Sequence, residues 1–254
     1  MATPESEAFV RTFARGLKVI EVMGQATGGQ TLTEIAEAAR LPRTAVRRFL
    51  MTLAELDFVR TDDKRYWLTP KVLRLGMSYL YTLPYWRHAQ LTLEGLCASV
   101  GQSCAISVLD GDDIVYIARL HASRILAMSP APGSRLPAHA VSMGRILLAG
   151  LRPDELAAYL AGVRIRRLTS STITDPDELA ARIRQADVQG YAWVDRELDD
   201  SICGIATPIR NAAGVTVAAI NVSLPSGLFT EATACEQFLL PLRQAASQIR
   251  SAMG

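Results

Sequence analysis

The sequence has few of the side chains from which metal centres and disulfide frameworks are built. It contains four cysteines and three histidines in 254 residues. The cysteines form no Cys-x-x-Cys pair and lie inside apolar runs, and the histidines are scattered. Zinc sites need closely spaced Cys and His ligands, whereas disulfide frameworks belong to secreted chains. We therefore predict free thiols in a reducing compartment, with no metal site and no cofactor.

Signals for export and membrane insertion are missing as well. The opening residues, MATPESEAFV, do not show the basic and then apolar pattern of a secretory signal. No apolar run approaches the roughly 20 residues that a membrane-spanning helix needs. These absences predict a cytoplasmic protein without a membrane partner.

The sequence also lacks a large excess of charge of either sign. The formal net charge is +2, which is too small for a general polycation. The distribution is uneven, because residues 1–82 hold 12 Lys and Arg against 9 Asp and Glu. All three lysines, Lys18, Lys64 and Lys71, lie in this first part. A mild basic excess indicates nucleic-acid binding only in combination with a motif.

Such a motif lies between Thr31 and Thr69. Thr31 followed by Glu34 is typical of a capping box at the start of a helix. Pro42 favours the first turn of a second helix, because proline has no amide hydrogen to leave unpaired. Two helices joined by a three-residue turn have the spacing of a helix-turn-helix. The segment FVRTDDKRYWLT then predicts a short hairpin, which is the place of the wing in a winged helix.

The second helix of such a motif enters the DNA major groove with its N-terminal residues at the base edges. Val46, Leu50 and Leu53 are spaced to face inward, which leaves the arginines outward. Arginine can bond two acceptors on a guanine edge or contact phosphates. The predicted DNA-binding residues are Arg43, Thr44, Arg47, Arg48, Lys64 and Arg65. The alternative is a surface helix of an all-α domain whose arginines are only solvated.

The rest of the chain predicts an α+β domain. Residues 103–120 and 202–223 each read as two strands around a turn. Strands that come as hairpins favour an antiparallel sheet. The predicted helices of this domain lie at about 85–99, 142–150, 153–161, 176–189 and 231–252. The segment 129–139, which holds three prolines, is predicted to be a loop.

These segments together resemble the IclR family of bacterial transcriptional regulators. Residues 15–82 are similar to the winged helix of that family in the order of their elements and in their amino-acid sequence. The segments PGSRLPAHAVSMGRILLAG and GIATPIRNAAGVTVAAINVS are similar to its loop-plus-helix and its closing strand pair, so the resemblance covers essentially the whole chain. The segments TAVRRFLMTLAEL, SMGRILLAG and RELDDSICGIATPIR look most like the branch that governs catabolism of small aromatic acids such as protocatechuate and 4-hydroxybenzoate.

The resemblance implies three parts. Residues 1–69 would form a winged helix-turn-helix DNA-binding domain and residues 70–83 a linker helix. Residues 84–254 would form an effector-binding and oligomerisation domain with a GAF/PAS-like antiparallel sheet. The family often has glycine in the helix-turn-helix turn and before the wing, where this chain has Arg40 and Asp57. If these positions need a left-handed backbone, Asp tolerates it better than Arg.

The resemblance also implies where an effector binds. A small carboxylate needs amide donors, hydroxyls and an arginine in an apolar cup, and a helix N-terminus suits an anion. The residues carried over from the family are Ser142, Met143, Gly144, Cys203, Gly204, Asn221 and Ser223. The family has serine where this chain has Asn221. The side-chain amide of Asn221 either pairs with a ring hydroxyl of the ligand or only ends a hydrogen-bond ladder of the sheet. Arg135 is the candidate partner of the carboxylate, and the alternative is a surface arginine.

Catalysis finds little support in the sequence. The segment AVSMG at 140–144 is the closest match to a nucleophile elbow, but it has Ala140 in place of the first glycine and no strand before it. Asp199 and Asp200 are adjacent, so their side chains diverge. An active site needs convergent groups, and the sequence predicts none. We therefore predict that the protein is not an enzyme.

These observations predict an allosteric transcription factor. It would bind a double-stranded DNA operator as a homodimer or homotetramer and respond to a small organic acid, aromatic in kind. One alternative is a regulator of the same family that senses a small aliphatic acid such as glyoxylate or pyruvate. Others are a small-molecule hydrolase with a helical regulatory domain and a co-regulator that binds protein in place of DNA.

Overall fold

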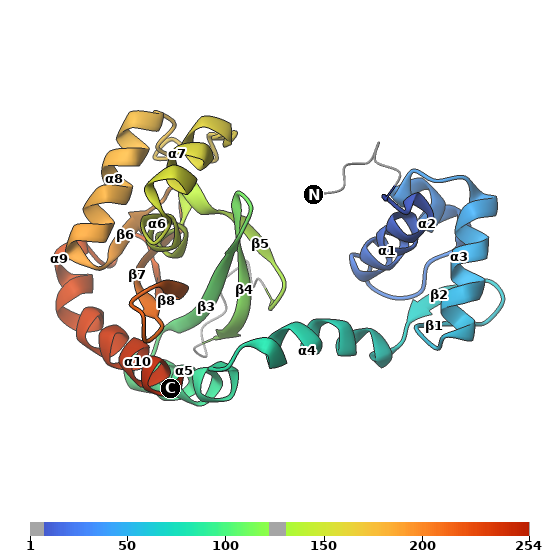
Figure 1. Ribbon diagram of the computed structural model, residues 1–254, viewed down its shortest axis with the longest axis horizontal. Coiled ribbons are helices and arrows are strands. Elements are labelled where there is room, and N and C mark those ends of the chain that lie inside the picture. The colour runs from blue at the N-terminus through green and yellow to red at the C-terminus, as the bar shows by residue number, and fades with distance from the viewer. Residues whose placement is uncertain (1–7, 122–130, 254) are drawn as a thin grey trace. The chain divides into compact units, whose positions relative to one another are not determined.

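The computed structural model describes residues 8–121 and 131–253. The chain divides into two compact units, the first ending at Tyr79 and the second beginning at Leu80 (Figure 1). No helix among the described residues is long and apolar enough to cross a membrane.

The first unit is a winged helix. It contains α1 (Arg11–Gly24), α2 (Leu32–Ala39), α3 (Arg43–Glu55), β1 (Val59–Thr61) and β2 (Tyr66–Leu68). The hairpin pairs Val59 with Leu68, and an isolated bridge joins Gln30 to Tyr66. The three helices and Val59 enclose one core, whose centre includes Val19, Ile35 and Leu50. The predicted helix-turn-helix and wing are confirmed.

The starts of α2 and α3 follow from local chemistry. Thr31 Oγ1 accepts a hydrogen bond from the Glu34 amide, and the Glu34 carboxylate accepts one from the Thr31 amide at 2.7 Å. The capping box is therefore complete. Pro42 lies at the N-cap of α3, one position earlier than the first turn that the sequence suggested.

Arg40 and Asp57 both have a left-handed backbone, with φ of 55° and 58°. Arg40 ends α2, and the following amide of Leu41 donates to the carbonyl of Ala36. Asp57 ends α3, and the following amide of Phe58 donates to the carbonyl of Leu53. These bonds satisfy carbonyls that the helix leaves open at its C-terminus. The two positions therefore need the conformation that glycine adopts most easily.

The second unit is built on a six-stranded antiparallel sheet in the order β5-β4-β3-β8-β7-β6. Its strands are β3 (Ser103–Asp110), β4 (Asp113–Leu120), β5 (Arg135–Pro137), β6 (Ala192–Asp195), β7 (Ile202–Arg210) and β8 (Thr216–Pro225). Before it, a short 3₁₀ turn (Pro70–Val72) leads into α4 (Leu73–Thr82). Its helices are α5 (Trp86–Val100), α6 (Ser142–Ala149), α7 (Pro153–Gly162), α8 (Pro176–Gln189), α9 (Glu231–Ala234) and α10 (Leu240–Ser251). The predicted α+β class with an antiparallel sheet is confirmed.

Two segments differ from the sequence prediction. The Pro-rich segment was expected to be loop, but Arg135–Pro137 pairs with β4 and Ala138–Ala140 forms a 3₁₀ turn. The strand tolerates Pro137 because β5 is at the edge of the sheet, where a missing amide donor costs little. Residues 129–130 lie outside the described residues. The edge strand β6 was not predicted, because four residues carry too little alternation to be recognised.

The sheet separates two hydrophobic cores. Side chains of β3, β7 and β8 such as Ile106, Ile205 and Val222 pack with α5 and α10. On the other face, α6, α7 and α8 cover the small side chains of Ala105, Ala206 and Ala219 (Figure 1). Successive strand residues point to opposite faces, which explains why alanine alternates with larger residues. The small residues let α6 pack closely on the middle of the sheet.

We expect Arg40→Gly to raise the free energy of unfolding of the first unit by up to about 1 kcal/mol. Removing the left-handed strain stabilises the folded state by about 1–2 kcal/mol. The greater backbone entropy of glycine in the unfolded chain offsets about 0.5–1 kcal/mol of this gain. Equilibrium urea unfolding measures the change. Arg40→Ala is the matched control, since it removes the side chain but keeps Cβ. A glycine variant no more stable than the alanine variant would contradict the strain.

Candidate functional site

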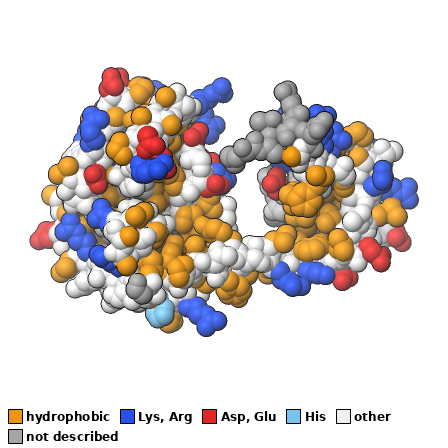
Figure 2. Space-filling model, in the orientation of Figure 1, with side chains coloured by type: hydrophobic (Ala, Val, Ile, Leu, Met, Phe, Trp, Pro, Cys, Tyr) orange, Lys and Arg blue, Asp and Glu red, His pale blue; other side chains and the backbone are white. Residues whose placement is uncertain are grey.

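The outward face of α3 carries the predicted DNA-binding arginines. Val46 and Leu50 are fully buried, whereas Arg43, Thr44, Arg47 and Arg48 are exposed. Among the described residues, no ion pair or hydrogen bond engages the three guanidinium groups. Figure 2 shows Lys and Arg side chains on the surface of this unit. The face is therefore free to contact an acidic polymer.

The wing carries both predicted cations, Lys64 and Arg65, on its exposed surface. Lys64 is exposed at the turn, but the guanidinium of Arg65 donates to the Gly29 carbonyl at 2.6 Å. Arg60, which the sequence reasoning did not single out, is exposed on β1 and lies 4.6 Å from the Trp67 ring centroid. The alternation of buried Val59 and outward Arg60 is the signal that could have found it.

The second unit contains a cavity of about 140 Å³ between α6 and the sheet. Its wall includes six of the predicted effector residues, namely Ser142, Met143, Cys203, Gly204, Asn221 and Ser223. The remaining lining residues are Tyr116, Arg119, Leu136, Ala140, Val141, Val194, Leu198, Asp199 and Ile202. Sequence reasoning thus found one side of the cavity and missed the side formed by β4, β5 and β6. In the described part of the chain, no group of three or more His, Cys, Asp or Glu is placed to hold a metal ion.

The N-terminus of α6 forms one wall of this cavity. Ser142 and Met143 are buried at the start of the helix, where the first amides have no acceptor within the helix. Gly144 is not a lining residue. A Cβ at this position would overlap the carbonyl oxygen of Ala138, so glycine here allows α6 to pack against the preceding 3₁₀ turn. Its contribution is to bring the helix start close to that turn.

Asn221 and Ser223 lie on the cavity face of β8. Asn221 Nδ2 donates to Ser223 Oγ at 3.1 Å. Asn221 Oδ1 is buried without a hydrogen-bond partner among the described residues. Across the sheet Asn221 faces the small side chains of Ala105 and Ala206, which leaves space above it. An unpaired buried acceptor costs free energy, and a ligand that donates a hydrogen bond would remove that cost.

Cys203 and Gly204 contribute to the cavity in different ways. The Cys203 side chain belongs to the core on the α5 and α10 side of the sheet. Burial raises the pKa of this thiol to about 12, so it stays neutral. Gly204 points to the cavity face, where a Cβ would come within 3.3 Å of Ser142 Oγ. We therefore assign the thiol to packing and Gly204 to the shape of the cavity.

Arg135 does not line the cavity. Its Nε donates to Asp113 at 3.0 Å, its Nη2 donates to the Asp110 carbonyl at 2.7 Å, and its Nη1 pairs with the Asp110 carboxylate. These two carboxylates raise the pKa of Arg135 and hold it at the β3–β4 turn. The predicted carboxylate partner is therefore already engaged elsewhere.

Arg119 supplies a cavity-lining cation that sequence reasoning missed. Ser107 pairs with Tyr116 and Ile106 with Ala118, so Ile117 is the extra residue of a β-bulge. The bulge puts Tyr116 and Arg119 on the same face, which simple alternation would not do. The guanidinium carbon of Arg119 lies 5.2 Å from the Tyr116 ring centroid. Arg119 Nε donates to His121 Nε2 at 3.2 Å, and no carboxylate among the described residues pairs with Arg119.

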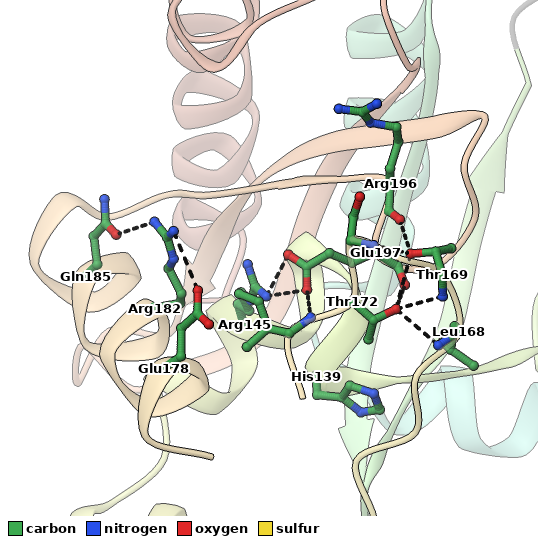
Figure 3. Close-up of polar contacts among 12 residues, drawn as sticks. His139, Arg145, Leu168, Thr169, Thr172, Glu178, Arg182, Gln185, Arg196 and Glu197 are labelled. Carbon is green, nitrogen blue, oxygen red and sulfur yellow. Dashed lines mark hydrogen bonds and ion pairs between the residues drawn. The ribbon is translucent and has the colours of Figure 1, made fainter. Parts of the chain in front are cut away.

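A buried ion pair joins α6 to the segment after β6, and both of these segments contribute residues to the cavity wall. Arg145 Nη2 donates to both carboxylate oxygens of Glu197, at 2.8 and 2.6 Å (Figure 3). The two side chains are only 4% and 7% exposed. The Ile173 amide also donates to Glu197, and Thr172 Oγ1 donates to the Glu197 carbonyl at 2.7 Å. The pair therefore ties α6 to the segment that continues into the lining residues Leu198 and Asp199.

A winged helix with a free arginine face, in one chain with an α+β unit that encloses a partly polar cavity, defines a ligand-responsive DNA-binding regulator. Residues 12–63 match the IclR helix-turn-helix domain, and residues 77–251 match the family described as bacterial transcriptional regulator IclR C-terminal. The chain belongs to the IclR family of transcriptional regulators. The resemblance seen in the sequence is confirmed, and the protein is a regulator rather than an enzyme.

Relatives of known role support the same conclusion. The chain is 39% identical to the Pca regulon regulatory protein of Pseudomonas putida, over 94% of this chain and 82% of that protein. It is 33% identical to the p-hydroxybenzoate hydroxylase transcriptional activator of Acinetobacter baylyi, over 99% and 97%. An IclR homolog from Microbacterium hydrocarbonoxydans, solved in complex with 4-hydroxybenzoate, matches with a TM-score of 0.82 at 25% identity, over 95% and 98%.

We expect Glu197→Gln to lower the free energy of unfolding of the second unit by about 3–5 kcal/mol, because it leaves the buried charge of Arg145 without its partner. Urea unfolding measures the loss. Glu178→Gln is the matched control, since Glu178 pairs with Arg182 at 3.9 Å on the surface and such pairs contribute less than about 1 kcal/mol. Equal losses in the two variants would show that burial does not determine how much the Arg145–Glu197 pair contributes to stability.

Proposed function

We propose that this protein is a cytoplasmic regulator that senses a small aromatic carboxylic acid of the hydroxybenzoate type. Residues 1–69 bind a double-stranded DNA operator, residues 70–83 link the domains, and residues 84–254 bind the effector and form the homo-oligomer. The observation that carries the choice of effector is the cavity. Its volume of about 140 Å³ is close to the roughly 150 Å³ of a cavity known to hold benzene.

The two polar ends of the cavity suit the two ends of a hydroxybenzoate. Arg119 lies opposite Ala105, and Ala105 lies opposite Asn221. Arg119 and Asn221 are therefore two strands apart, which corresponds to about 10 Å between their backbones. An aromatic ring fits between their side chains. In this pose Arg119 binds the carboxylate, and the ring hydroxyl donates to Asn221 Oδ1 beside the start of α6.

The relatives support an aromatic effector. The names of two of them refer to the Pca regulon and to p-hydroxybenzoate hydroxylase, and a similar structure holds 4-hydroxybenzoate. The set that we propose for this chain is Arg119 with Ser142, Met143, Gly204, Asn221 and Ser223, and Cys203 contributes only its backbone to the cavity wall. Arg135 and Gly144 are not part of it, because one is bound to acids and the other packs against backbone.

The proposed operator complex uses Arg43, Thr44, Arg47, Arg48, Lys64 and Arg65 of the winged helix. Exposed apolar side chains on α1 and α4, such as Phe13 at 67% and Leu73 at 70%, support assembly into a dimer or tetramer. Two winged helices related by symmetry would then bind a palindromic operator. Effector binding regulates only if it favours one arrangement of these units over another.

We expect Arg119→Gln to weaken binding of both benzoate and 4-hydroxybenzoate, and Asn221→Ala to weaken only 4-hydroxybenzoate. Loss of the Asn221 hydrogen bond, worth about 1 kcal/mol, corresponds to roughly a fivefold higher Kd. Isothermal titration with 4-hydroxybenzoate, protocatechuate, benzoate, glyoxylate and pyruvate measures these values. Arg135→Gln is the control and should bind normally. Binding of glyoxylate or pyruvate alone would contradict the aromatic effector.

We expect Arg47→Ala to weaken operator binding by about 1–3 kcal/mol, because an arginine that bonds a guanine edge contributes that much discrimination. The measurement is a DNA-binding titration with the DNA upstream of the protein's own coding sequence, at fixed salt. Arg184→Ala removes an exposed arginine from the second unit and should leave the Kd unchanged. An unaltered Kd in Arg47→Ala would remove this residue from base recognition.

A further inference from the structure

The second unit contains another cavity, polar in character, on the far side of the Arg145–Glu197 pair. Its volume is about 230 Å³, and it lies among α6, α8, β6 and the start of α9. Its polar lining residues are Arg145, Arg182, Gln185, Gln189, Asp195, Glu197 and Glu231. None of them lines the effector cavity. The cavity therefore has no part in the site proposed above.

The arginines of this cavity have hydrogen-bond donors to spare. Arg145 is nine-tenths buried, yet only its Nη2 is bonded, and its Nε has no partner among the described residues. Arg182 makes only long contacts, 3.4 Å to Gln185 and 3.9 Å to Glu178 (Figure 3). A guanidinium can donate five hydrogen bonds, so most of the donors of both groups are unused.

The acids of the cavity, in contrast, are already occupied. Asp195 accepts hydrogen bonds from Ser226 Oγ at 2.7 Å and from Arg196 Nε at 3.2 Å. Glu231 accepts one from the Tyr191 hydroxyl at 3.0 Å. Glu197 accepts from Arg145 and from a backbone amide. The unmet hydrogen-bonding capacity is therefore on the donor side, which calls for a ligand rich in acceptors.

The charged lining residues are two arginines and three acids, and the two guanidinium groups are the part of the lining that attracts an anion. Burial lowers the pKa of the Arg145 guanidinium, Glu197 raises it, and the like charge of Arg182 lowers it. Arg145 and Arg182 line the same cavity and carry like charges that repel each other. An anion between two guanidinium groups relieves that repulsion and accepts paired hydrogen bonds from each of them.

We propose that this polar cavity is a second ligand site, which binds a small oxyanion such as a carboxylate or phosphate through Arg145 and Arg182. The site shares two chain segments with the effector cavity. Arg145 follows Ser142 and Met143 on α6, and Glu197 precedes Leu198 and Asp199. The oxyanion therefore binds to the segments that also shape the effector site.

The test is the thermal unfolding midpoint of the full chain in succinate and in inorganic phosphate, against sodium chloride at equal ionic strength. The comparison of succinate with phosphate identifies the class of oxyanion. A saturable rise, about 5–10 °C at a hundredfold excess over Kd, is expected with at least one of them. Arg182→Gln should abolish the rise. Arg184→Gln should keep it, because Arg184 is exposed on the same helix outside the cavity.

Binding of these anions to the effector cavity is distinguished with Arg119→Gln, which should keep the rise. A rise lost in Arg119→Gln and kept in Arg182→Gln would overturn the proposal. The proposal would also be overturned if sodium chloride produced the same rise, or if the rise persisted in every variant. It would equally be overturned if neither succinate nor phosphate raised the unfolding midpoint. The result does not depend on 4-hydroxybenzoate, so this site and the proposed effector can fail separately.

Discussion

Arg145 and Glu197 form an ion pair with only 4% and 7% of their side chains exposed, and this pair links α6 to the segment after β6. Separating two buried charges is expensive, so α6 and the segment after β6 are held at a fixed distance. Arg145 follows Ser142 and Met143 on α6, and Glu197 precedes Leu198 and Asp199, and these four residues line the proposed effector cavity. Local propensity would not hold these segments together, since Glu197 lies 52 residues from Arg145 in the chain.

The cavity itself results from a contrast of side-chain size across one sheet. Large residues fill the face that packs on α5 and α10, whereas alanines and Gly204 cover the face below α6. Gly144 lets the start of α6 approach the preceding turn. The helix start, with its free amides, therefore lies over small residues and beside Asn221. A ligand in that space would contact several separate segments at once, which is what a switch between two arrangements needs.

The winged helix shows a different compromise. Arg40 and Asp57 adopt the left-handed backbone that glycine accepts without strain. The strain is tolerated because each position ends a helix whose last carbonyls need partners, and Lys71 bonds to the Leu56 carbonyl and pairs with Asp57 at 3.6 Å. The arginines of α3 remain free because Val46 and Leu50, together with the partly buried Phe49 and Leu53, supply the inward face of that helix. Core and binding face thus occupy opposite sides of one short element.

Much of this protein is determined by local sequence patterns. The capping box at Thr31, the spacing of Val46 and Leu50, and the two long hairpins predict the winged helix and the antiparallel sheet, because each pattern acts over a few residues. Asn221 and Ser223 share a face for the same reason. The tertiary structure alone decided the rest. A β-bulge at Ile117 turned Arg119 into the cavity, two aspartates at a turn engaged Arg135, and the fold brought Arg145 to Glu197. These outcomes depend on register and on contacts between distant segments, which no local periodicity encodes.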